Sequence, residues 1–302
     1  MPFTADVALV VDARAEAGES PWWSAREHVL YWVDIHGCKV HRYDPTSDVD
    51  DVLVTPDLVA FCATHTNGGL IVALRDRVCH VDFAEAAFRT LSVMRLPDGV
   101  RLNDGTIDPA GRLWIGTMDS RGDAAANAAL YRIDVDGRCE MMLDGFRTVN
   151  GLAFAPDGST LYVSDSHPAV RTIWALDYDV RRGIANARRV FVATHRLPGR
   201  PDGGAVDAEG CYWMAAVDGG CLMRFGADGE LLSTWAMPVE KPSKAAFGGA
   251  GLSTLFVTSL RRNLSRPIDA QPHAGGLFAL QTGIRGIALP DCAIATLISA
   301  AG

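Results

Sequence analysis

Apolar residues along this chain gather in short runs that recur at nearly regular intervals. Each run combines leucine or tyrosine with aromatic and β-branched residues, and most follow a turn rich in Gly, Asp or Asn. Runs of this length and composition are typical of buried strands rather than of amphipathic helices. The six copies start 40 to 51 residues apart, at Leu30, Leu70, Leu113, Leu161, Tyr212 and Leu255.

A second strand-like run follows each copy, and tight turns punctuate the same period. Antiparallel hairpins require such turns between their strands. Examples of the second run are residues 40–45, 130–134 and 222–226, and the turn tetrads are residues 108–111, 155–158, 207–210 and 226–229. The pattern therefore predicts that every repeat is built from antiparallel hairpins.

A repeat of this length made of short strands indicates a β-propeller, with about four strands in each blade. Six copies predict an all-β fold of six blades, and we expect residues 7–11 to complete the last blade so that the ring closes. Helical repeats are the alternative, but no apolar stripe of 3.6-residue period extends over eleven or more residues. Since no linker divides the repeats, residues 1–302 are expected to form a single domain.

Composition and charge narrow the classes of function. Of 302 residues, 48% are apolar and 21% are charged, which suits a globular protein with a large core. The net charge is −8 and no basic run exceeds two residues, so we expect no nucleic-acid partner. The sequence contains no leader-like or bilayer-spanning segment, and its seven cysteines include no CxxC pair. We therefore expect a cytoplasmic protein with reduced thiols and no membrane partner.

Four polar segments occupy the same position in the repeat, about ten residues before the recurring strand. They contain Glu19, Arg101 with Asn103, Asn150, and Asp202, and glycine or proline lies close to each. Loops at one end of a closed propeller converge, so the shared position predicts that these segments meet at one mouth of the channel. Asn-Gly and Asp-Gly are also ordinary turn dipeptides, and this alternative stays open for each segment taken alone.

Two carboxylates and an amide carbonyl are hard oxygen donors. Such a set suits Ca²⁺, Mg²⁺ or Mn²⁺ and leaves positions open for water and substrate, whereas a set closed by His or Cys would indicate structural zinc. The eight histidines are scattered without metal-ligand spacing. G-x-S-x-G, P-loop and GxGxxG motifs are absent, so neither a nucleophile-elbow hydrolase nor a nucleotide cofactor is supported.

Taken in order, the motifs resemble those of the SMP-30/gluconolactonase/regucalcin-like family, which includes sugar lactonases. Residues 18–23, Gly-Glu-Ser-Pro-Trp-Trp, are close to the family's G-E-G-P-x-W opening. The other matching segments are residues 31–35, 101–105, 108–118, 150–151, 156–158, 161–166, 201–203, 207–210 and 247–249. Each motif is weak alone, but the ordered set is specific and extends from about residue 15 to residue 280.

The resemblance implies a six-bladed propeller that binds one divalent metal ion, with Ca²⁺, Zn²⁺, Mn²⁺, Mg²⁺ and Fe²⁺ as the candidates. It implies that Glu19, Asn150 and Asp202 hold the ion. Asp202 also matches the residue that acts in the family as general base or proton shuttle. Arg101 and Asn103 match positions that contact the substrate.

The stretch after the Gly-Thr-Met segment departs from the family pattern. The family often places an acidic residue there to bind sugar hydroxyls, whereas this chain has Arg121 where the acid is expected. Asp119 is a candidate substitute. The difference leaves the sugar preference open.

The resemblance thus implies a metal-dependent hydrolase that opens aldonolactones of the gluconolactone, xylonolactone or arabinonolactone type in sugar oxidation. Its expected partner is a small sugar lactone. Two alternatives stay open: a metal-binding propeller without turnover, since a fold alone does not confer catalysis, and a hydrolase of other lactones, esters or phosphotriesters. The sequence leaves the oligomeric state open.

Overall fold

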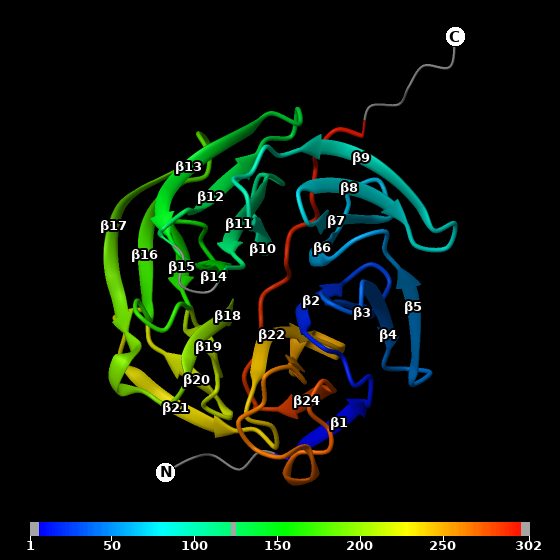
Figure 1. The fold of residues 1–302 in the computed structure, drawn as a ribbon, viewed down its shortest axis with the longest axis vertical. Helices are drawn as coiled ribbons and strands as arrows, with labels where there is room; N and C mark the ends of the chain where they lie inside the picture. Colours follow the sequence, from blue (N-terminus) through cyan, green and yellow to red (C-terminus); the bar gives the residue numbers. More distant parts are fainter. Residues whose placement is uncertain (1–5, 122–124, 297–302) are drawn as a thin grey trace.

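A computed structural model describes residues 6–121 and 125–296 as six four-stranded antiparallel sheets arranged around a central axis (Figure 1). This confirms the six-bladed, all-β propeller predicted from the repeats. The strands of blades 1 to 3 are β2 (Gly18–Ser24), β3 (Val29–Asp34), β4 (Lys39–Asp44) and β5 (Val49–Val54); β6 (Val59–Thr64), β7 (Leu70–Leu74), β8 (Arg77–Asp82) and β9 (Ala87–Val93); and β10 (Val100–Ile107), β11 (Leu113–Asp119), β12 (Ala128–Ile133) and β13 (Cys139–Phe146).

Blades 4 to 6 follow the same plan. Their strands are β14 (Val149–Phe154), β15 (Thr160–Asp165), β16 (Thr172–Asp179) and β17 (Ile184–Ala193); β18 (Arg200–Val206), β19 (Tyr212–Val217), β20 (Cys221–Phe225) and β21 (Leu231–Ala236); and β22 (Pro242–Gly248), β23 (Thr254–Ser259) and β24 (Leu277–Gln281) with β1 (Val7–Val11). Three 3₁₀ turns lie in the connections: η1 (Thr194–Arg196), η2 (Ala250–Leu252) and η3 (Ile268–Ala270). In the described ranges, no helix has the length and apolar character needed to cross a bilayer.

Blade 6 joins the two ends of the chain. Its strand order is β1–β24–β23–β22, and β1 pairs antiparallel with β24, with Val7 opposite Leu280 and Leu9 opposite Phe278. The predicted completion of the last blade by residues 7–11 is therefore confirmed. The ring closes through hydrogen bonds between the first and last strands described.

The recurring apolar runs are the second strands of the blades, and they form much of the core. Trp32, Trp114 and Trp213 on β3, β11 and β19 are almost fully buried. These side chains pack between neighbouring blades, as when Trp213 meets Phe247 of blade 6 edge to face, with ring centroids 5.8 Å apart. Full burial of a large apolar side chain contributes roughly 1.5–3 kcal/mol, so the second strands hold the blades together.

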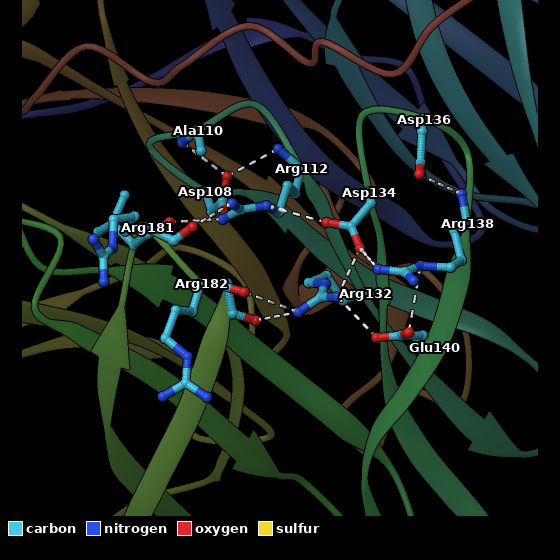
Figure 2. Close-up of polar contacts among 12 residues, drawn as sticks. Asp108, Ala110, Arg112, Arg132, Asp134, Asp136, Arg138, Glu140, Arg181 and Arg182 are labelled. Carbon is cyan, nitrogen blue, oxygen red and sulfur yellow. Dashed lines mark hydrogen bonds and ion pairs between the residues drawn. The ribbon is translucent and has the colours of Figure 1, made fainter.

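Two of the predicted turn tetrads begin with an aspartate that is fully buried. Asp108 Oδ1 accepts the Arg112 amide at 2.9 Å, and its Oδ2 accepts Arg112 Nη1 at 2.8 Å (Figure 2). Asp207 has the same place in blade 5, where its Oδ2 accepts Trp213 Nε1 and Arg224 Nε, both at 2.8 Å. Asp207 thus binds β19 and β20 to its turn, whereas Asp108 holds its own turn and accepts the Tyr178 hydroxyl of blade 4. The tetrads therefore do more than reverse the chain.

Residues 285–295 form a strap across one end of the channel, drawn in red through the centre of Figure 1. Gly286 pairs with blade 5, Cys292 pairs with blade 2, and the Ala295 amide donates to a carbonyl of blade 3. Beneath the strap lies a chamber of about 280 Å³, lined mainly by apolar residues near the ends of β2, β14 and β22. The innermost strands, those nearest the axis, are β2, β6, β10, β14, β18 and β22. Their first residues face the other end of the channel.

We expect Asp207→Asn to lower the free energy of unfolding by about 3 kcal/mol, because the buried Arg224 loses its fully buried carboxylate partner and keeps only an ion pair with the exposed Glu209. Denaturant-induced unfolding measures the change. Asp228→Asn is the matched control, since Asp228 is exposed and accepts the Glu230 amide at another hairpin. We expect it to change stability by less than about 0.5 kcal/mol. Equal losses in both variants would contradict a special role for the buried aspartate.

Candidate functional site

The polar segments expected to meet at one mouth lie on the innermost strands of four blades. Glu19 is on β2, Asn103 on β10, Asn150 on β14 and Asp202 on β18, and all four line one cavity. The expectation that these segments are loops is wrong, because each strand continues through its segment with a shift in pairing register. Such a bulge redirects side chains without ending the strand, which places polar groups at the axis.

Buried aspartates at the ends of two second strands fix the chain just before the site. Asp34, at the end of β3, accepts the amides two and three residues before Glu19, at 3.0 and 3.1 Å. Asp165, at the end of β15, accepts the amides two and three residues before Asn150, at 3.2 and 2.8 Å. The same device therefore positions two of the candidate ligands.

Two glycines allow close packing beside the candidate ligands. Gly151 has a φ of +66°, and a Cβ there would lie 2.5 Å from the Tyr212 hydroxyl oxygen. A Cβ on Gly203 would lie 2.3 Å from the Cβ of Lys244. Both distances are too short for a side chain, so the glycines that follow Asn150 and Asp202 are required by packing at the axis and not merely by a turn.

A chain of hydrogen bonds connects four of the predicted residues. Arg101 Nη1 donates to Asn103 Oδ1 at 3.0 Å, and Asn103 Nδ2 donates to Asn150 Oδ1 at 2.9 Å. Asn150 Nδ2 in turn donates to Asp202 Oδ1 at 2.7 Å. All four side chains belong to buried residues, and a connected buried network fixes the orientation of its members.

Glu19 and Asp202 are the carboxylates that line the cavity in the described part of the chain. Burial raises the pKa of Glu19 well above its usual value, and the charges of Asp202 and Asp104 raise it further. Burial also raises the pKa of Asp202 to about 7, although the charge of Arg200 opposes the shift. Each acid therefore tends to hold its proton unless a cation compensates its charge.

A buried ion pair lies next to these acids. Lys244 Nζ is 2.5 Å from Asp104 Oδ1, and both side chains are almost completely buried. Neither residue is assigned a role from the sequence alone. A signal was present, because Lys244 lies eleven residues before Leu255, the same offset that separates Glu19 from Leu30.

Asp119 does not take the place of the acid that the family pattern puts after the Gly-Thr-Met segment. Its Oδ1 accepts Arg121 Nε at 2.9 Å and its Oδ2 accepts Arg121 Nη2 at 2.5 Å. The hydrogen bonds from Arg121 hold the pKa of the Asp119 carboxyl well below its usual range. Met118 and Ser120 line the cavity here instead, so Asp119 serves as the partner of Arg121.

The cavity has a volume of about 400 Å³, and basic residues outnumber acidic ones in its lining. Besides Arg101, its lining includes His36, Arg200, Lys241 and Arg262. These four residues were not predicted from the sequence to be site residues. A lone basic residue in a connection or at the start of a strand normally indicates surface charge, so the sequence held no signal that would place these residues at the axis.

Glu19, Asn150 and Asp202 form a donor set that fits a divalent cation. The two carboxylates are buried with raised pKa values, and neither forms an ion pair with a described residue. Asn150 Oδ1 accepts one hydrogen bond, which leaves a second lone pair on the amide oxygen. Since the described residues contain no group of three His, Cys, Asp or Glu side chains suited to a metal, binding here would depend on the amide and on water.

Comparisons with known proteins identify relatives of this chain and agree with its fold. Residues 17–261 match the family described as SMP-30/Gluconolactonase/LRE-like region. The chain is 38% identical over 285 residues to a 6-deoxy-6-sulfogluconolactonase of Pseudomonas putida, covering 93% of this chain and 96% of the relative. It is 36% identical over 254 residues to a pentonolactonase of Haloferax volcanii, covering 84% of each. A solved structure of the calcium-binding protein regucalcin from Agrobacterium tumefaciens is 27% identical with a TM-score of 0.91, covering 97% of this chain and 99% of the other.

In the presence of a chelator, we expect the stability of the protein to fall as the pH rises from about 5 to 8. The folded-state pKa of Asp202, about 7, exceeds the value of about 4 for an unfolded chain, so protonation favours the folded state. That stabilisation is lost as the pH passes through the folded-state pKa. Thermal unfolding across this range measures the effect, and a profile that Asp202→Asn does not flatten would contradict the assignment.

Lys244→Met is expected to cost about 3–5 kcal/mol of stability, because it leaves the Asp104 carboxylate buried without its partner. Adding Asp104→Asn should restore part of the loss, since a neutral amide removes the unpaired charge. Urea unfolding of the single and double variants provides the measurement. A double variant that loses the full sum of the two single effects would show that the pair does not act as a unit.

Proposed function

The chain belongs to the SMP-30/gluconolactonase/LRE-like family, and on this premise we propose that it is a hydrolase that opens sugar lactones to the corresponding acids. The observation that carries the proposal is the buried group of two carboxylates and one amide at the mouth of the channel. An acid in a cavity whose pKa is raised to about 7 is typical of a catalytic or metal-binding site.

We propose that Glu19, Asn150 and Asp202 hold one divalent cation. When bound, such an ion polarises a lactone carbonyl and lowers the pKa of water. Oxygen donors of this kind accept Ca²⁺, Mg²⁺, Mn²⁺, Zn²⁺ and Fe²⁺, and the supply of each metal contributes to the choice. The related regucalcin is described as calcium-binding, which supports Ca²⁺ as the first ion to test.

Asp202 is the proposed general base. The Asn150 amide donates a hydrogen bond to Asp202 Oδ1 at 2.7 Å and so orients the carboxylate that accepts the proton. As the water oxygen bonds to the lactone carbonyl carbon, the water proton passes to Asp202. The bond between that carbon and the ring oxygen then breaks, and the ring oxygen takes the proton from Asp202 to give the open acid.

Arg101 and Asn103 have different proposed roles. Arg101 Nη1 is used by the Leu102 carbonyl and by Asn103, so Nε and Nη2 are the donors that remain for a substrate. Asn103 Nδ2 donates to the Val149 carbonyl and to Asn150 Oδ1. Because both amide donations are used, we assign Asn103 to positioning Asn150 and Arg101 to contact with the substrate.

The proposed substrates are aldonolactones of five- or six-carbon sugars. A cavity of about 400 Å³ is of the right order for a ligand of this size. The relatives named for a sulfogluconolactone and for pentonolactones support sugar lactones over other esters or phosphotriesters. All seven cysteines are free, which supports a reducing cytoplasm as the place of reaction.

We expect Asp202→Asn to lower lactone hydrolysis by about 10²- to 10⁴-fold, the range associated with loss of a general base. A pH-stat assay with gluconolactone, xylonolactone and arabinonolactone, with and without chelator, measures both the base and the metal requirement. Asp228→Asn, at an exposed hairpin, should retain activity.

Hydrolysis that persists unchanged in chelator would contradict the metal requirement. Turnover of no lactone with any of the five metals would instead support a propeller that binds without catalysis. Near-ultraviolet circular dichroism of the Asp202→Asn protein distinguishes lost chemistry from lost folding.

A further inference from the structure

The mouth of the cavity is positively charged although the chain as a whole carries a net charge of −8. The cations that line it are Arg101, Arg200, Lys241 and Arg262. The acidic residues that line the same cavity are Glu19 and Asp202, the two carboxylates of the candidate metal site. A divalent cation held by those carboxylates would add to the positive charge at the mouth.

Two of the four cations already have a partner. Arg200 Nη2 lies 2.7 Å from Asp218 Oδ2, and Lys241 Nζ forms an ion pair with Asp218 Oδ1. Arg101 and Arg262 differ, because neither forms an ion pair with a carboxylate in the described part of the chain. Arg101 is 7% exposed, and a buried guanidinium without a counter-ion is costly.

The loop that carries Arg262 is held on both sides of that residue. Before it, the Arg261 amide donates to the Glu16 carbonyl at 3.1 Å. After it, the Glu240 carboxylate accepts the Ser265 amide at 2.5 Å and the Ser265 hydroxyl at 2.9 Å. The loop is therefore anchored, so the half-buried Arg262 is presented to the cavity from a fixed backbone.

The neighbouring groups respond to this positive field. Burial lowers the pKa of His36 to about 4, and the charges of Arg262 and Arg101 contribute to the shift. Burial also lowers the pKa of Arg101 to about 10; the charges of Arg75 and, to a smaller extent, Arg262 lower it further, while the charge of Glu19 opposes the shift. Two guanidinium groups whose positive charges repel each other are stabilised when an anion binds between them.

We propose that the substrate carries an anionic oxo group at the end of the sugar away from the lactone carbonyl, and that Arg262 binds this group together with the free donors of Arg101. The inference rests on the proposed lactonase function and specifies the charge of its substrate. Guanidinium groups match carboxylate, sulfonate and phosphate oxygens through paired hydrogen bonds. Met118 and Ser120 line the cavity where the family pattern expects an acid, so that position adds no repulsion.

The test compares D-glucaro-1,4-lactone, which has a carboxylate at C6, with D-glucono-1,4-lactone, which has a hydroxyl there. Wild-type protein should have the higher kcat/KM for the charged lactone. Arg262→Gln should reduce the ratio of the two values by about 10- to 100-fold, mainly through KM, as expected for loss of a charged hydrogen bond. Arg262→Lys should recover part of the ratio because it keeps the charge. Lactones with a sulfonate or phosphate at C6 then identify the preferred oxo group.

Arg181→Gln is the matched control, since it removes the same charge from an exposed turn between β16 and β17. It should leave the ratio unchanged. Added salt should lower the ratio in the wild type more than in Arg262→Gln. A wild-type ratio at or below one would overturn the proposal. Equal losses on both lactones in Arg262→Gln would also overturn it, by indicating contact with the ring or with the carboxylate common to both products.

Binding separates this inference from the proposed function. If no lactone is opened, the proposed function is wrong, but calorimetric titration with D-glucarate and D-gluconate still measures the preference for a second anionic group. Tighter binding of D-glucarate that depends on Arg262 would support the anion site. Equal affinities, or a preference unaffected by Arg262→Gln, would refute it.

Discussion

Closure of the ring by hydrogen bonds between β1 and β24 is the constraint on which the site depends. It fixes the distance between opposite innermost strands, so side chains far apart in the sequence meet at the axis. Lys244 and Asp104 are 140 residues apart and form an ion pair, and Asn150 and Asp202 are 52 residues apart and share a hydrogen bond. The Lys244–Asp104 pair joins blades 6 and 3 across the axis, so its geometry depends directly on closure of the ring.

Within the closed ring, the charges of the buried side chains near the axis determine which chemistry the site can support. Three acids, Glu19, Asp104 and Asp202, lie close enough to influence one another, and Lys244 forms an ion pair with Asp104. The remaining two acids have raised pKa values because burial is not offset. Perturbed acids in a cavity are typical of catalytic or metal-binding sites, whereas Asp108 and Asp207, with arginine and backbone partners, serve the fold.

The fold could be predicted from the sequence because the second strand of each blade is buried and leaves a recurring apolar run. Placement of Glu19, Asn150 and Asp202 in one cavity could also be predicted, since an equivalent position in each repeat maps to an equivalent position around the axis. Their location on bulged strands could not, because a register shift depends on the partner strand. Arg262 was missed for a similar reason: the groups that hold its loop, including Glu240, come from other parts of the chain.

The strap of residues 285–295 also has a consequence for the entry of substrate and the release of product. The strap lies across one end of the channel and the polar cavity lies at the other end, so we expect substrate and product to use the same mouth. The product must therefore leave through this mouth before the next substrate enters. A molecule bound at this mouth would block substrate entry and product release together.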